Sequence, residues 1–139
     1  MKTLDRLIQI SAFELDQARQ KLVDLQAAHD DLANQVMRLD SQMADEMTAA
    51  RDDPALTASI GNYLRATRAR QATLRASMRD LEAEIEPARE VVSEAFRENK
   101  RFTHVRDNRL AEVKKRRQRR EQEDLDEMGL QLTRRKNSG

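Results

Sequence analysis

The sequence has no cysteine and no tryptophan, and its 139 residues include one tyrosine, three phenylalanines, three glycines and two prolines. Without cysteine, the chain cannot form disulfide bonds, zinc–thiolate sites or a cysteine nucleophile. So few aromatic residues exclude a thick globular core, and no apolar run approaches the roughly 20 residues that cross a membrane. The N-terminal stretch contains Asp5 and Arg6 among its apolar residues, unlike a signal peptide. We therefore expect a soluble, cytoplasmic protein.

Charged side chains are abundant, at 37% of all residues, although the formal net charge is only +1. The two signs are separated along the chain. Residues 1–60 have a net charge of −5, and residues 61–139 have one of +6. The sharpest change is near the C-terminus, where residues 101–120 have a net charge of +7 and residues 121–127 one of −5. Such blocks are typical of solvated helix faces or binding surfaces.

Apolar residues recur at alternating spacings of four and three, in two runs that we call the first and second seams. A stripe this narrow is typical of a coiled coil and not of a helix packed on a broad core. The first seam consists of Leu4, Ile8, Ser11, Leu15, Ala18, Leu22, Leu25, His29, Leu32, Val36, Leu39 and Met43. The second seam consists of Ile60, Leu64, Thr67, Gln71, Leu74, Met78, Leu81, Ile85, Ala88, Val92, Ala95, Asn99 and Phe102.

Between the two seams, the pattern stops at Asp52, Asp53 and Pro54. Proline does not fit a helix interior, and the residue before it is pushed toward extended backbone, so a turn is expected here. The predicted fold is all-α, a long antiparallel two-helix coiled-coil hairpin with a C-terminal helical overhang. The alternative is a single long helix that dimerises with a second chain. If residue 50 faces residue 59, residue 4 faces residue 105.

We expect one domain over residues 1–139. Its parts are arm one at about 3–50, a turn at about 51–58, arm two at about 59–105 and an overhang at about 106–136. Thr57 or Ser59 is expected to cap the second helix. Pro87 is expected to kink that helix, and the alternative is that it opens a separate third helix.

No group of residues has the pattern of a catalytic or metal site. The two histidines, His29 and His104, are far apart in sequence, and His29 occupies a seam position where a polar residue sets the register. The same interpretation applies to Gln71 and Asn99. The acidic pair Glu82 and Glu86 has no pocket that would desolvate it, which argues against general acid–base chemistry. We therefore expect no enzyme activity, no cofactor, no bound metal and no small-molecule substrate.

The sharpest local feature is the basic run KKRRQRR at residues 114–120. It has three interpretations. A solvated face would pair Arg119 with Glu123 and Arg120 with Asp124 along the helix. A docking face would meet an acidic protein surface. A nucleic-acid site would neutralise backbone phosphates, but no aromatic side chain for base stacking lies nearby.

The C-terminal run LAEVKKRRQRREQEDLDEMGLQLTRRK, residues 110–136, resembles the signature end of the FliJ family. That family is the soluble component of the flagellar type III protein export apparatus and is similar to the YscO proteins of injectisomes. The resemblance is specific in Arg119–Gln122, Leu125–Glu127 and Arg134–Arg135, and Gly61–Leu64 and Arg97–Lys100 fit it as well. Pro87 and the aromatic-poor stretch after Tyr63 depart from the family pattern.

The resemblance implies a non-enzymatic stalk and coupling protein for flagellar biogenesis. Such a protein binds the hexameric export ATPase FliI, promotes assembly of its ring and links it to the export gate protein FlhA. FliH and the export chaperones are further implied partners. The protein would be cytoplasmic and would reach the cytoplasmic face of the inner membrane only through these partners. Two alternatives remain, a basic coiled-coil protein associated with nucleic acid and a structural homodimeric tether.

The charge pattern and the resemblance together place the ATPase contact on the overhang. The predicted contact residues are Lys114, Lys115, Arg116, Arg117, Arg119, Arg120, Asp126 and Glu127. The export gate contact is predicted near the turn, at Tyr63 and Leu64. Tyr63 is the only tyrosine in the chain, and its alternative role is packing across the hairpin tip.

Overall fold

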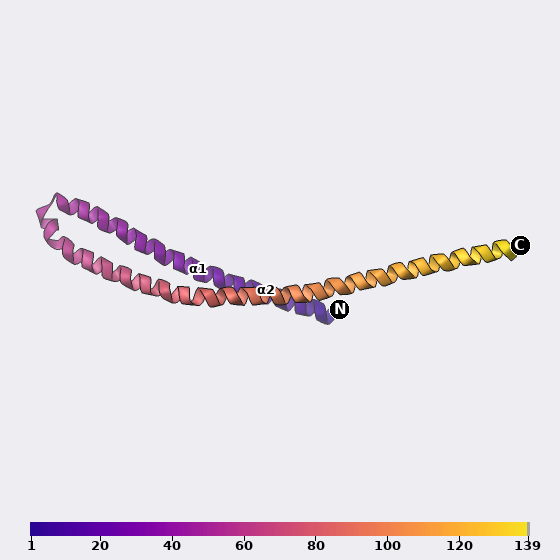
Figure 1. Ribbon diagram of the computed structural model, residues 1–139. Helices are drawn as coiled ribbons and strands as arrows, with labels where there is room; N and C mark the ends of the chain where they lie inside the picture. Colours follow the sequence, from indigo (N-terminus) through magenta and orange to yellow (C-terminus); the bar gives the residue numbers. More distant parts are fainter. Residues whose placement is uncertain (139) are drawn as a thin grey trace. The chain divides into compact units, whose positions relative to one another are not determined.

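The computed structural model describes residues 1–138, which form the two helices α1 (Lys2–Arg51) and α2 (Pro54–Ser138). The helices are 50 and 85 residues long, and no strand occurs within the described range. The two helices pack against each other as a helical hairpin, so the predicted all-α hairpin fold is confirmed (Figure 1). None of the described helices is long and apolar enough to cross a membrane.

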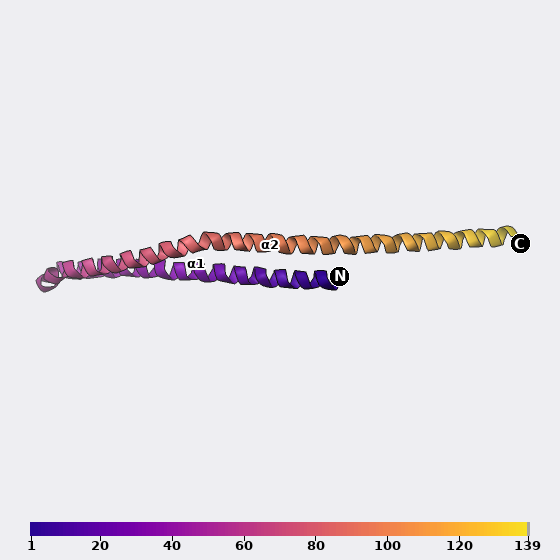
Figure 2. The same ribbon diagram turned by 90° about the horizontal axis from the view of Figure 1, so that it is seen from below.

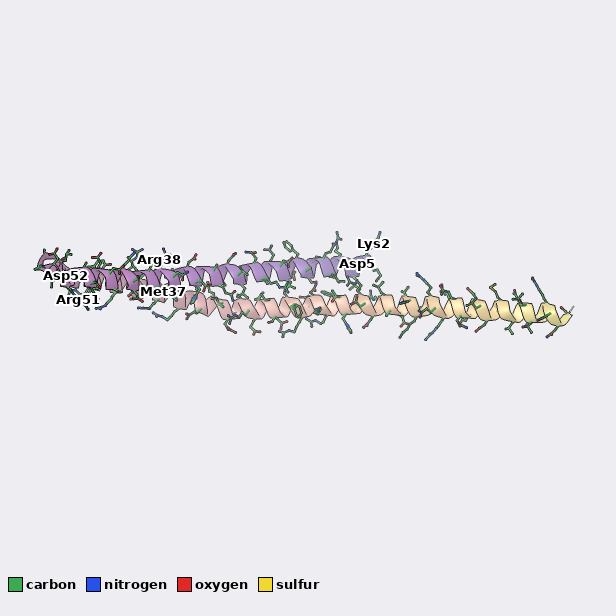
Figure 3. The ribbon with its side chains drawn as sticks, turned by 90° about the horizontal axis from the view of Figure 1, so that it is seen from above. Lys2, Asp5, Met37, Arg38, Arg51 and Asp52 are labelled. Atoms are coloured by element: carbon green, nitrogen blue, oxygen red, sulfur yellow. The ribbon has the colours of Figure 1, made fainter. Side chains whose placement is uncertain are left out.

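The chain divides into two compact units, which are described separately. The hairpin unit is Phe13–Phe96, and the terminal unit combines Met1–Ala12 with the chain from Arg97 onward. The hairpin unit contains the connection between α1 and α2, which is visible in two perpendicular views (Figures 1 and 2). Arg51 and Asp52 lie at this connection (Figure 3).

The connection between the helices is shorter than the sequence predicts, because only Asp52 and Asp53 lie between the end of α1 and the start of α2. The Asp53 carboxylate accepts a hydrogen bond from the Ala55 backbone N–H at 2.9 Å, which makes Asp53 the N-cap of α2. Pro54 is then the first helical residue, where a fixed φ and a missing N–H cost nothing. The predicted turn at about 51–58 is therefore wrong in its length, since Pro54 starts the helix as well as ending the previous pattern.

Thr57 and Ser59 lie inside α2, so neither is the cap that the sequence predicts. The Thr57 hydroxyl has a different role, because its oxygen lies 2.6 Å from the carbonyl oxygen of Ala50. That carbonyl belongs to the last turn of α1, where the carbonyl oxygens have no backbone N–H donor further along their own helix. Thr57 thereby ties the end of α1 to the start of α2.

Replacing Asp53 with alanine should destabilise the protein by about 1 kcal/mol, because the Ala55 N–H loses its partner and a negative charge leaves the helix N-terminus. Asp52→Ala is the matched control, since it removes the same charge one residue earlier from an exposed side chain that caps nothing. Urea unfolding monitored by circular dichroism measures both. Equal losses for the two variants would contradict the capping role.

All positions of the first and second seams are buried or half-buried, as the spacing of four and three predicts. Most are only half-buried, because a seam between two helices is one layer deep and has solvent on both sides. The buried seam residues are Leu4, Ser11, Leu15, Ala18, Val36, Met43, Thr67, Gln71 and Ala88. Helix α2 continues through Pro87, so the third helix that the sequence left open is not formed.

Polar residues in the seams find partners across the helix pair. In the hairpin unit, the Gln71 side-chain amide donates to the Val36 carbonyl oxygen at 3.0 Å and to the Asp40 carboxylate at 2.6 Å. In the terminal unit, the Asn99 amide donates to the Ser11 hydroxyl at 2.9 Å. Each observed partner lies within two residues of the position that is expected if residue 50 faces residue 59. These contacts are consistent with polar seam residues that define one register.

Candidate functional site

The part of α2 from Asp107 to Ser138, which we call the C-terminal segment, is exposed at every residue. The spacing of the second seam explains why. Continued beyond Phe102, it falls on Arg106, Arg109, Val113 and Arg116, so arginine replaces the apolar residues that would bury a helix. The segment remains helical without a packed partner in its unit, and its side chains are available for contacts with other molecules.

All eight residues predicted to contact the ATPase lie in the C-terminal segment, and all are exposed. At about 100° of rotation per residue, the six basic side chains of residues 114–120 are distributed around most of the helix. The acidic residues Asp126 and Glu127 follow within two to four turns. The structure therefore presents the predicted positive and negative blocks in succession along one exposed helix.

Few of these charges are neutralised within the helix. Arg116 Nε lies 3.8 Å from Glu112 Oε1, and the Gln122 amide donates to the Asp126 carboxylate at 3.2 Å. The predicted pairs of Arg119 with Glu123 and of Arg120 with Asp124 are not formed among the described residues. Exposed ion pairs contribute only about 0–1 kcal/mol, so intrahelical ion pairs would stabilise this helix only slightly.

Tyr63 and Leu64 lie in the hairpin unit, in the third turn of α2, and both are half-buried. Leu64 lines a shallow apolar hollow beside the turn together with Met47, Ala50 and Ile60. Its side chain therefore takes part in packing near the hairpin tip. A contact of Tyr63 and Leu64 with the export gate stays a prediction.

His29 is half-buried in the hairpin unit, and its Nε2 lies 2.9 Å from Glu82 Oε1 of α2. Its Nδ1 lies 3.9 Å from Asp30 Oδ1. The partnership of His29 with Glu82 was not predicted from the sequence. The expected register could have suggested it, because it places His29 opposite residue 80, two residues from Glu82. Among the described residues, no group of three or more histidine, aspartate or glutamate side chains is placed to hold a metal ion. The arrangement is that of a polar pair across the seam.

Comparison with known proteins identifies one matching family. The sequence model of the family described as "Flagellar FliJ protein" matches residues 1–138. No curated protein and no solved structure matches the chain. The family match covers both helices, including the hairpin unit and the C-terminal segment.

Proposed function

Because the chain belongs to the FliJ family of flagellar export components, we propose that it is the stalk and coupling protein of that apparatus. In this role it binds the hexameric export ATPase FliI, promotes assembly of the ATPase ring and links the ring to the export gate protein FlhA. The role requires no catalytic group. The chain acts through binding surfaces on its helices.

The exposed C-terminal segment is the observation that most favours this proposal. A partner that meets a helix through charged side chains is oriented by them, and the charges speed the encounter without a large apolar interface. Within the segment, residues 107–120 have a net charge of +5, and residues 121–127 that follow have one of −5. A ring subunit with acidic and basic patches in the complementary order would bind it in one direction.

We place the export gate contact beside the turn of the hairpin unit, at Tyr63 and Leu64, and not on the C-terminal segment. Half-buried residues beside a turn combine some apolar surface with a backbone that is held in place. FliH and the export chaperones are further partners of the proposed complex, with no surface assigned to them. The protein would work in the cytoplasm and would meet the inner membrane through its partners.

Neutralising three basic side chains of the C-terminal segment should weaken binding to the cognate export ATPase. The variant Lys114→Gln, Arg117→Gln, Arg120→Gln removes three exposed charges that form no ion pair among the described residues. At roughly 0.5–1 kcal/mol for each charge, the dissociation constant should rise between about 10-fold and about 150-fold. Fluorescence anisotropy of the labelled chain, titrated with the ATPase at low and high salt, measures this change.

The matched control is Arg68→Gln, Arg70→Gln, Arg75→Gln, which removes the same charge from exposed positions of the hairpin unit. It should bind within about twofold of the unchanged protein, since distant exposed charges are largely screened. Equal weakening in both triple variants would mean that net charge and not this segment determines binding. No weakening in either would remove the C-terminal segment as the contact.

A further inference from the structure

Five of the six large apolar side chains exposed on the C-terminal segment lie on one side of the helix, and the sixth, Leu130, lies on the other side. At about 100° per residue, Leu110 and Met128 point in the same direction, and Val113, Leu125 and Leu132 lie within about 60° of it. All five are exposed, from 48% at Leu110 to 62% at Leu125 and Leu132. Scattered apolar residues are normal on a surface, but an aligned stripe of them marks a contact surface.

Charged residues occupy the middle of the same stripe. Arg117 lies about 20° from the Leu110 direction and Asp124 lies about 40° from it, on the same side. Read along the helix, the stripe is apolar at Leu110 and Val113, basic at Lys114 and Arg117, acidic at Glu121 and Asp124, and apolar again at Met128 and Leu132. When the helix is read in the opposite direction, the basic residues take the place of the acidic ones, and each apolar end takes the place of the other. The stripe is therefore complementary to itself in the antiparallel direction.

We propose that the C-terminal segment is a self-association surface whose occupant is the same segment of a second copy of this chain, packed antiparallel to it. A twofold axis between Arg120 and Glu121 brings Arg117 of one copy opposite Asp124 of the other, and Val113 opposite Met128. Both contacts occur twice, as a twofold interface requires.

A further pair flanks the stripe on the same side. Arg116 and Glu127 lie at about 120° and 100° from the Leu110 direction, where the long side chains of a two-helix contact form interhelical ion pairs. In the antiparallel register, Glu127 of one copy lies two residues, about 3 Å along the axis, from the position level with Arg116 of the other, within reach of the long arginine side chain. A parallel register would instead place Arg117 against Arg117 and Asp124 against Asp124. The charge order thus favours one orientation.

A charge-exchange experiment on the full-length chain tests this proposal without any ATPase. The first variant is Arg116→Glu, Arg117→Glu, and the second is Asp124→Lys, Glu127→Lys. Each variant alone places like charges opposite each other in both halves of the dimer. Mixing the two variants restores opposite charges at all four positions. The mixture contains the same chains as the separate samples, so a change in helix content cannot explain a difference between them.

Sedimentation equilibrium at low salt should show the unchanged chain in a monomer–dimer equilibrium. Each variant alone should raise the dimer dissociation constant at least about tenfold, and an equal mixture should return it to near the original value. A monomeric unchanged chain at the highest soluble concentration would overturn the proposal. So would a mixture that associates no better than its components.

Cross-linking tests the orientation, and the absence of native cysteine makes it straightforward. Under mild oxidation, a mixture of Val113→Cys and Met128→Cys chains should form the mixed disulfide in preference to either symmetric one. Positions 113 and 128 are about 22 Å apart along one helix, so a chain that contains both cysteines cannot close the bond on itself. Predominant Val113→Cys homodimers would indicate a parallel contact and overturn the antiparallel register.

Discussion

Replacing Gln71 with glutamate is expected to destabilise the hairpin by about 3 kcal/mol at neutral pH. Gln71 is only 2% exposed, and its amide nitrogen is shared between the Val36 carbonyl oxygen and the Asp40 carboxylate. Glutamate has nearly the same shape but no donor. It also buries a negative charge beside a carbonyl oxygen and a second carboxylate. Both effects act against the folded state.

Gln71→Met is the matched control, because it keeps the length of the side chain and removes its polar atoms. The Val36 carbonyl keeps its bond within α1, and the exposed Asp40 carboxylate turns to water, so the cost should stay below about 1 kcal/mol. Urea unfolding followed by circular dichroism compares the three proteins. A loss for Gln71→Glu no larger than that for Gln71→Met would contradict both the stabilising role of the Gln71 amide donor and the cost of a buried charge at position 71.

The small loss expected for Gln71→Met also explains what Gln71 contributes. A polar residue at a seam position adds little stability over an apolar one, but it is satisfied only in a register that supplies its partners. Gln71 finds Val36 and Asp40, and His29 finds Glu82, within the same antiparallel alignment of the hairpin unit. Slipping one helix by a turn would move the Gln71 amide away from the Asp40 carboxylate.

Both seams could be predicted from the sequence because the spacing of apolar residues along a helix is local information. Each position from Leu4 to Met43 and from Ile60 to Phe102 that the spacing selects is withdrawn from solvent. The exposed helix after Arg106 could be predicted for the same reason, since arginine takes over the seam positions. The placement of Lys114 to Arg120 on an exposed surface follows directly.

The helix connection could not be predicted in detail, because Pro54 has two opposite meanings. Proline ends a helix when it falls in the interior and begins one when it falls in the first position. Deciding between them requires the backbone of Asp53, whose carboxylate reaches the Ala55 N–H only once the turn has formed. The role of Thr57 as a partner of Ala50 likewise depends on how the two helices meet.

The contacts of the C-terminal segment with other molecules are a different case. Its charges are visible in the sequence, but a binding partner contributes half of any interface, and its surface is not encoded in this chain. The family match over residues 1–138 identifies the apparatus. We propose that the ATPase contacts the basic and acidic residues predicted for it, which are Lys114, Lys115, Arg116, Arg117, Arg119, Arg120, Asp126 and Glu127.

Truncation after Val113 is expected to abolish stimulation of the export ATPase while leaving the hairpin folded. The deleted residues include the whole run of residues 114–120 and the acidic block that follows it. Every described residue of the deleted part is exposed, so its removal exposes no packed surface. The unfolding transition of the truncated chain should therefore match that of the full chain.

The decisive measurement is the steady-state rate of ATP hydrolysis by the cognate flagellar export ATPase, alone, with the full chain and with the chain ending at Val113. The proposed function predicts a higher rate with the full chain and the unstimulated rate with the truncated one. Equal stimulation by the two chains would place the ATPase contact elsewhere on the helices. No stimulation by the full chain would contradict the proposed function itself.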